Sequence, residues 1–133
     1  MLNKIFCVDD DPITLMLCKK VISKMEFSKE TVTAKNGEEA LQYYIDSKKD
    51  GITTNLPQLI FLDLNMPVMG GWEFLDSFCK DEFSEFNNTP IVVLSSTIDP
   101  ADLEKTKKYP MVIDFLSKPI SFAMLDYLSQ KLV

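Results

Sequence analysis

The stretch Leu59-Ile60-Phe61-Leu62-Asp63 decides the fold of this chain. Its first four residues are all apolar, whereas a strand with one exposed face would alternate apolar and polar side chains. The run therefore predicts a strand that is buried on both faces and ends abruptly at an aspartate. Similar runs occupy residues 4–8, 91–94 and 112–116, and a weaker one occupies residues 31–34. The chain is thus expected to form five strands.

Helical patterns lie between the predicted strands. Asp11 and Asp99 are each followed by proline, and this pairing of a capping side chain with a proline in the first turn is typical of a helix start. Asn36 introduces a second helix in the same way, with acidic residues in the first turn. Two further amphipathic patterns cover residues 72–79 and 122–132. Five helices therefore alternate with the five strands.

This alternation predicts an α/β fold with a parallel sheet, because parallel neighbours are joined by crossover helices on both faces. We expect a doubly wound five-stranded parallel sheet in the flavodoxin-like order 2-1-3-4-5, with helices on both faces. The length of 133 residues suits one domain, residues 1–133. A polar stretch, Ser47 to Pro57, is expected to form a long connection before the third strand. The aromatic residues Trp72, Tyr43 and Tyr44 are expected to pack rather than bind.

The composition excludes several functions. Twenty acidic and 14 basic residues give a net charge of −6, which argues against direct binding of nucleic acid. The absence of histidine excludes histidine catalysis and histidine metal ligands. Three scattered cysteines form neither a disulfide framework nor a zinc site, so we expect reduced, mostly buried thiols. Because no stretch reaches the roughly 20 apolar residues that cross a bilayer, we expect a cytoplasmic protein without membrane insertion.

Polar side chains follow the predicted strands on one edge of the sheet. In the expected strand order, Asp9 and Asp10, Asp63, Ser95 and Lys118 converge on one crevice. Clustered carboxylates favour a hard divalent cation with oxygen ligands, and Mg²⁺ fits an open, water-rich site. Lysine and a serine hydroxyl are suited to bind a phosphoryl group beside that ion. The combination predicts phosphoryl transfer with a carboxylate as nucleophile, whereas Asp11 is expected to act only as a helix cap.

The motifs resemble those of the receiver domains of two-component response regulators, the CheY-like family. The resemblance covers essentially the whole chain and depends on four motifs in the right order. These are Val8-Asp9-Asp10, the segment Leu62-Asp63-Leu64-Asn65-Met66-Pro67 with Met69-Gly70-Gly71, Ser95, and Lys118-Pro119.

The resemblance implies a role for each residue of the acidic group. Asp63 would be the phosphoacceptor. Asp10 and Asp63 would coordinate Mg²⁺ directly, Asp9 would act mainly through bound water, and the backbone carbonyl of Asn65 would complete the protein's ligands. The domain would thereby assist its own phosphorylation and dephosphorylation without being a conventional enzyme.

Four other roles also come from the resemblance. Lys118 would pair with one phosphoryl oxygen, and Ser95 would donate a hydrogen bond to another. Phe115 matches the switch aromatic of the family, expected to turn inward as Ser95 moves. Ser96, a small residue, would leave the approach of the phosphodonor open. Met66, Pro67 and Gly71 are assigned to loop geometry.

The implied function is a stand-alone response regulator, in which phosphorylation shifts a two-state equilibrium. The phosphodonor would be a sensor histidine kinase or a histidine phosphotransfer protein in trans. A downstream effector would bind the face formed by helix 4, strand 5 and helix 5. A phosphate sink in a phosphorelay and a phosphorylation-dependent homodimer remain open alternatives.

Three rival functions fit the residues less well. A haloacid-dehalogenase-like phosphohydrolase would need an acid two residues after the nucleophile, where this chain has Asn65. A flavin carrier would need phosphate-binding donors after the first strand, where this chain is acidic. A pseudo-receiver would have lost part of the acidic site.

The sequence also departs from the family pattern at three places. Phe115 lacks the hydroxyl of the tyrosine found in some relatives, and Gly70 stands where aspartate is frequent. Tyr109-Pro110 replaces the usual Gly-Ala turn before strand 5, which we expect to reshape the surface of helix 4.

Overall fold

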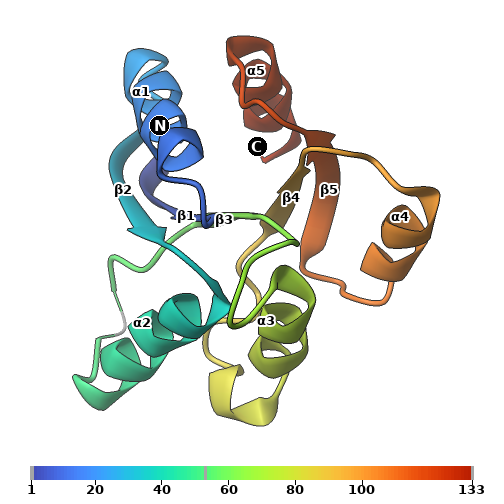
Figure 1. Ribbon diagram of the computed structural model, residues 1–133. Coiled ribbons are helices and arrows are strands. Elements are labelled where there is room, and N and C mark those ends of the chain that lie inside the picture. Colours follow the sequence, from blue (N-terminus) through green and yellow to red (C-terminus); the bar gives the residue numbers. More distant parts are fainter. Residues whose placement is uncertain (1, 53, 133) are drawn as a thin grey trace.

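The structure, a computed structural model, describes residues 2–52 and 54–132. Its strands pair in parallel in the order β2-β1-β3-β4-β5, which confirms the predicted fold class and strand order (Figure 1). The strands are β1 (Leu2–Val8), β2 (Ser28–Ala34), β3 (Leu59–Leu62), β4 (Ile91–Ser95) and β5 (Val112–Ser117). The helices are α1 (Pro12–Lys24), α2 (Gly37–Lys49), α3 (Gly71–Phe78), α4 (Pro100–Thr106) and α5 (Phe122–Lys131), with a short 3₁₀ helix, η1 (Asp81–Phe83).

Two layers of helices cover the sheet. Helices α1 and α5 lie on one face and helices α2 and α3 on the other, while α4 lies beside the β5 edge (Figure 1). One apolar core joins α1 and α5 to the sheet through residues such as Ile22 and Leu125. A larger core joins α2 and α3 to the opposite face through Tyr44, Phe74 and Phe78. The sheet is therefore buried on both sides, as the uninterrupted apolar runs predict.

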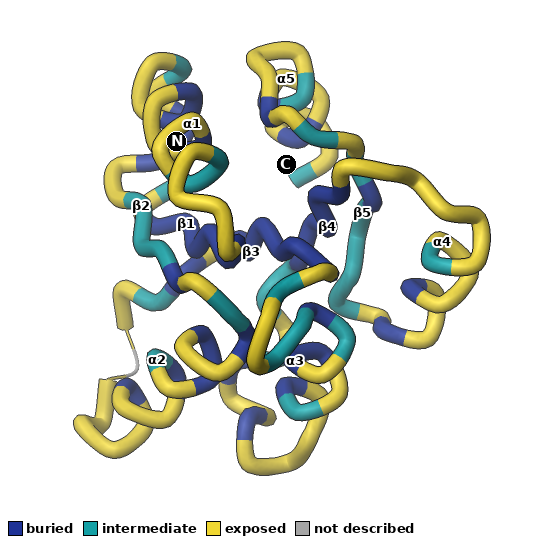
Figure 2. The backbone as a smooth tube through the Cα atoms, in the orientation of Figure 1, coloured by how far each residue is buried: buried dark blue, intermediate teal, exposed yellow. Residues whose placement is uncertain are grey.

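The central strands are more deeply buried than the edge strands. Every residue of β3 and β4 is buried, and the dark strands at the centre of Figure 2 show this burial. The edge strand β2 is largely polar and starts at Ser28, three residues before the predicted run at Thr31. Pairing with β1 places Ser28 opposite Leu2, so tertiary contact extends β2 beyond its apolar residues.

The predicted helix starts are confirmed by side-chain caps. Asp11 accepts a hydrogen bond from the backbone N–H of Ile13, and Asn36 accepts one from Glu39, each at 2.9 Å. Asp99 caps α4 by accepting from the backbone N–H of Ala101. These bonds satisfy N–H groups that have no partner within the helix.

Two local features differ from the sequence prediction. Helix α2 continues to Lys49, so Ser47 is helical and does not begin the connection. Its hydroxyl donates to the backbone carbonyl of Tyr43 at 2.8 Å, which satisfies this polar group inside the helix. The second feature is η1, which was not predicted. Phe83 and nearby Phe86 are buried in the core under α2 and α3, and this burial orders a segment that reads as a polar turn.

The cysteines and aromatic residues agree with expectation. Cys7 and Cys18 are buried and Cys79 is exposed, so the thiols are mostly buried. Tyr44 is only 1% exposed, and its ring packs against the rings of Phe78 and Phe86.

Candidate functional site

The end of β1 supplies two carboxylates with different surroundings. The backbone N–H of Asp9 donates to the carbonyl of Ala34, which continues the sheet pairing one residue beyond β1. The carboxylate of Asp9 is buried and accepts from the backbone N–H of Asp11 at 2.9 Å. Asp10 is exposed. Asp11 is confirmed as the cap of α1, so its carboxylate is directed to the helix.

The end of β3 supplies the third carboxylate. Asp63 is 5% exposed, and its backbone N–H donates to the carbonyl of Val8 at 3.0 Å. One carboxylate oxygen accepts weakly from the N–H of Asn65 at 3.4 Å. Gly71 allows the following chain to return close to this site, because a β-carbon there would lie 2.5 Å from the carbonyl oxygen of Asp63. Gly71 therefore has the role in loop geometry that the sequence predicts.

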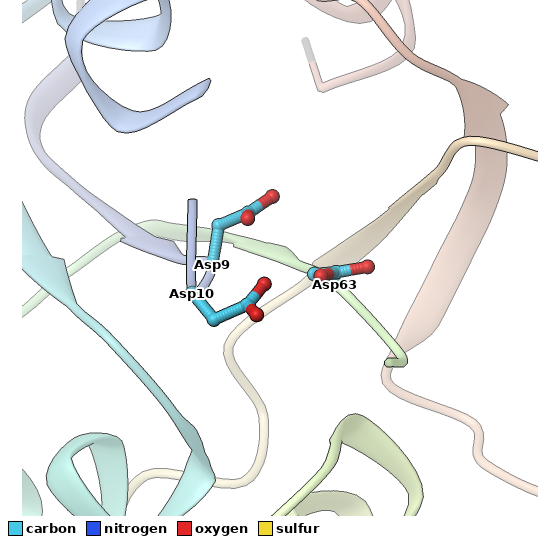
Figure 3. A group of neighbouring side chains, drawn as sticks. All are labelled: Asp9, Asp10 and Asp63. Carbon is cyan, nitrogen blue, oxygen red and sulfur yellow. The ribbon is translucent and has the colours of Figure 1, made fainter. Parts of the chain in front are cut away.

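The three carboxylates Asp9, Asp10 and Asp63 converge. One oxygen from each lies within 4.8 Å of the others, and Figure 3 shows the side chains gathered at the ends of β1 and β3. Burial raises the pKa of Asp63, and the negative charge of Asp9 raises it further. An all-oxygen group with excess negative charge is the donor set that Mg²⁺ prefers. The residues present therefore fit a magnesium ion.

Lys118, the residue directly after β5, lies beside this acidic group. Its Nζ lies 2.6 Å from one oxygen of Asp9 and 3.5 Å from one oxygen of Asp63. Partial burial disfavours the charged amine, but the hydrogen bond to Asp9 and the attraction of Asp63 outweigh this effect and raise the pKa of Lys118. The lysine therefore remains a cation beside the carboxylates. Its backbone N–H donates to the carbonyl of Ser95 at 2.8 Å, which links the ends of β4 and β5.

The two serines after β4 lie in different surroundings. Ser95 is 2% exposed, and its hydroxyl accepts from the backbone N–H of Thr97 at 3.4 Å. Ser96 is exposed. Ser95 therefore occupies a buried position at the carboxyl edge, and Ser96 faces solvent beside it.

Phe115 already packs inside the domain, so the inward turn that the resemblance implies for this residue would not change its position from the one in this structure. It is 8% exposed and forms a small apolar cluster with Leu64 and Val93, against which Trp72 and Val112 pack. Leu64 directly follows Asp63, so this cluster supports the loop that carries the acidic site. The structure thus gathers Asp9, Asp10, Asp63 and Lys118 directly, while Phe115 lies in an apolar layer beside them.

Two features of this region have only weak signals in the sequence. Val68 has a φ of 72° and is 76% exposed, although a β-branched residue strongly disfavours this left-handed conformation. Its place in a Pro-x-x-Gly loop was the one available hint. The helical pattern predicts packing for Trp72, but a single helical pattern does not show that its side chain contacts two separate parts of the fold.

The comparisons with known proteins concern the family and the fold. Residues 5–128 match the family model of the response regulator receiver domain. The hybrid signal transduction histidine kinase I of Dictyostelium discoideum is 29% identical over 123 residues, covering 92% of this chain and 7% of the kinase. The chain therefore spans only a small part of that relative.

Two solved structures resemble the whole fold. A two-component response regulator from Cytophaga hutchinsonii has a TM-score of 0.86 and 29% identity, covering 98% of this chain and 96% of that chain. The chemotaxis protein CheY4 of Vibrio cholerae has a TM-score of 0.78 and 26% identity, with all of both chains covered. No helix within the described residues has the length and apolar character needed to cross a membrane.

Proposed function

The chain belongs to the response regulator receiver domain family of two-component signalling, and from this premise we propose that it is a phosphorylation switch with Asp63 as the acceptor. Receiver domains are signalling switches and not classical enzymes. The observation that carries the proposal is the convergence of Asp9, Asp10 and Asp63 within 4.8 Å, with Lys118 paired to Asp9 and Asp63. We further propose that residues 1–133 act as one receiver domain.

The proposed metal is Mg²⁺, held by the carboxylates of Asp10 and Asp63 and the backbone carbonyl of Asn65, with Asp9 acting mainly through bound water. The raised pKa of Asp63 supports this assignment, because it reflects a buried carboxylate next to negative charge that a cation would balance. When bound, the metal supplies positive charge for the carboxylates and for the phosphoryl oxygens.

The proposed reaction begins with attack by a carboxylate oxygen of Asp63 on the phosphorus of a phosphohistidine. A phosphorus–oxygen bond forms, the phosphorus–nitrogen bond breaks, and the imidazole leaves with the bonding electrons and takes a proton from water. Lys118, already 3.5 Å from Asp63, can neutralise a phosphoryl oxygen after a small shift from Asp9. The hydroxyl of Ser95 would donate to a second oxygen, and exposed Ser96 would leave room for the donor.

The proposed phosphodonor is a sensor histidine kinase or a histidine phosphotransfer protein. These 133 residues contain no histidine, so the phosphohistidine lies outside them. We propose that the output passes to an effector through the face of α4, β5 and α5, with Ser95 and Phe115 as switch residues. A two-state shift of this kind requires that the effector bind one arrangement of the face more tightly. A phosphate sink would need the same acceptor chemistry without this differential binding, and a phosphorylation-dependent homodimer would use a second copy as the partner.

The central test is incubation with acetyl phosphate and Mg²⁺, followed by intact-mass measurement. The wild type should gain one phosphoryl group, and Asp63→Asn should gain none. Asp11→Asn is the matched control, because it removes a nearby carboxylate but keeps a residue that caps helices well. Equal labelling of the wild type and Asp63→Asn, or no labelling of the wild type, would contradict the proposal. Steady turnover of unrelated phosphomonoesters would instead favour a phosphohydrolase.

A further inference from the structure

Trp72, in the first turn of α3, contacts the surroundings of the acidic site on one side. Its side chain packs against the small apolar cluster of Leu64, Val93 and Phe115. Leu64 is bonded to Asp63, and Phe115 is a proposed switch residue. A displacement near Asp63 or Phe115 would therefore change the surroundings of the indole.

Trp72 also contacts the end of α4. The Nζ of Lys105 lies over the indole, 4.4 Å from the ring centroid, in a cation–π arrangement. The ring of Tyr109 lies 5.9 Å from the indole, centroid to centroid. The hydroxyl of Tyr109 donates to Asp76 of α3 at 2.5 Å. Burial and this hydrogen bond raise the pKa of Tyr109 to about 12, so the hydroxyl keeps its proton at neutral pH.

Apart from its contact with β5, helix α4 has few other anchors within the described residues. Thr106 is the only buried residue between Pro100 and Thr106. The segment from Ser96 to Pro100, which connects Ser95 to α4, is exposed throughout. The helix is thus attached to Ser95 through an exposed segment at one end, and its other end is held to α3 by Trp72, Asp76, Lys105 and Tyr109.

We infer that these four residues, the α3–α4 clasp, hold α4 in the arrangement of the unphosphorylated domain and rearrange when a phosphoryl group draws Ser95 toward Asp63. This inference rests on the proposed function and names the contacts through which phosphorylation would change the position of α4. The clasp stabilises the unphosphorylated arrangement, so it weakens binding of the phosphoryl group. By thermodynamic linkage, the phosphoryl group weakens the clasp by the same factor. Trp72, Lys105 and Tyr109 are then positioning residues.

The clasp also accounts for a departure from the family pattern. Tyr109-Pro110 stands where a Gly-Ala turn is usual, and a glycine or alanine at position 109 could neither place a ring against Trp72 nor donate to Asp76. The altered turn therefore places a new contact between α3 and α4.

The test uses the full chain with Mg²⁺ and beryllofluoride, an analogue of the phosphoryl group, and follows the fluorescence of Trp72, the single tryptophan. The emission of the wild type should change on saturation. Tyr109→Phe keeps the ring but removes the bond to Asp76, and it should lower the half-saturating beryllofluoride concentration about three- to tenfold. Tyr44→Phe is the matched control, because Tyr44 lies in α2, away from α4, and its hydroxyl has no hydrogen-bond partner among the described residues. Its half-saturation should match the wild type.

A second pair of variants separates the cation–π contact from overall charge. Lys105→Gln should tighten beryllofluoride binding severalfold, because it releases α4 from Trp72. Lys107→Gln removes the same charge next to α4, where the lysine pairs with Glu104 at 2.9 Å, and should leave binding unchanged. Circular dichroism and thermal unfolding check that each variant is folded.

Two outcomes would overturn the clasp while leaving the proposed function intact. One is beryllofluoride binding by Tyr109→Phe and Lys105→Gln that matches their controls. The other is unchanged Trp72 emission in a wild type that takes one phosphoryl group by intact mass. Failure of the proposed function looks different, because the wild type would then take no phosphoryl group and show no response to beryllofluoride. That result would remove the basis of the clasp as well.

Discussion

The aromatic core around Phe78 and the acidic edge around Asp63 follow opposite rules of packing. Phe78 is fully buried, and the ring centroids of Phe74 and Tyr44 lie 5.1 Å and 5.0 Å from its own. At the acidic edge, by contrast, three carboxylates lie within 4.8 Å of one another, and burial raises the pKa of Asp63. The core stabilises the domain, whereas the edge retains charges that oppose folding.

This contrast separates side chains that stabilise the fold from side chains that are suited to bind a ligand. Apolar rings in contact gain from burial and from dispersion, so they need no ligand. Clustered carboxylates become favourable only when a cation or Lys118 balances them. A charged group that lowers the stability of the isolated domain but is well placed to bind a ligand is typical of a functional site.

The largest expected effect is on the core. Phe78→Ala should lower the free energy of unfolding by about 3–5 kcal/mol, because it removes a buried ring and leaves a cavity. Urea unfolding measures this loss. The folded fraction should still accept a phosphoryl group from acetyl phosphate, since Phe78 lies away from the carboxylates. A loss below about 1 kcal/mol would show that the surrounding rings do not form the main stabilising core.

Val68 offers a test within the loop that carries the acidic site. Its φ of 72° costs a β-branched residue about 1–2 kcal/mol, whereas asparagine tolerates this conformation. Val68→Asn should therefore raise the free energy of unfolding by about 1 kcal/mol. Ile98→Asn is the control, because Ile98 is also an exposed apolar residue but is not among the positive-φ residues. Equal effects of the two changes would show that the backbone at Val68 is not strained.

Removal of the Asp63 charge should stabilise the domain in the absence of Mg²⁺. We expect Asp63→Asn to raise the free energy of unfolding by about 1 kcal/mol at pH 7 once solvent screening is allowed for, since the buried carboxylate next to Asp9 is disfavoured. Thermal unfolding in a chelator measures this gain. Added Mg²⁺ should stabilise the wild type and leave the variant nearly unchanged.

The pH dependence distinguishes this charge effect from a change in packing. Because the pKa of Asp63 is raised on folding, the folded state binds a proton more tightly than the unfolded state. The stability penalty is complete above the folded pKa and disappears below the unfolded pKa of about 3.9. The gap between Asp63→Asn and the wild type should therefore close as the pH falls through this window. A gap that stays constant would point to packing.

The smallest expected effect concerns a polar group inside the apolar core. The hydroxyl of Tyr44 is buried without a hydrogen-bond partner among the described residues. Tyr44→Phe should therefore be neutral or stabilising by up to about 1 kcal/mol in urea unfolding. Tyr109→Phe, which loses a bond to Asp76, should instead destabilise by about 1 kcal/mol. Equal losses in both variants would imply a partner for Tyr44.

Many features of the aromatic core and of the acidic edge could be predicted from the sequence. The apolar run of β3 predicted a strand with two buried faces, and Asp63 at its end marked the edge at which the carboxylates gather. The caps Asp11, Asn36 and Asp99 were predicted because a cap depends on residues two or three positions away. The convergence of Lys118 with Asp9 was predicted only through the expected strand order.

Other features could not be predicted because distant groups decide them. The start of β2 at Ser28 depends on its pairing with Leu2, not on its own polar residues. The segment with Phe83 and Phe86 becomes ordered because Tyr44 and Phe78 bury its rings. Tyr44 is distant in sequence from this segment, and apolar residues in a polar turn do not indicate where they will pack.

The sequence by itself determined the strands, the helix starts and the types of residue that meet at the carboxyl edge, because periodicity and capping depend on near neighbours in the chain. Only the tertiary structure decided that Lys118 pairs with both Asp9 and Asp63, that Val68 adopts a positive φ, and that Trp72 joins the Phe115 cluster to α4. These features depend on side chains and loop ends that packing brings together from distant parts of the chain. Local sequence patterns do not contain that geometry.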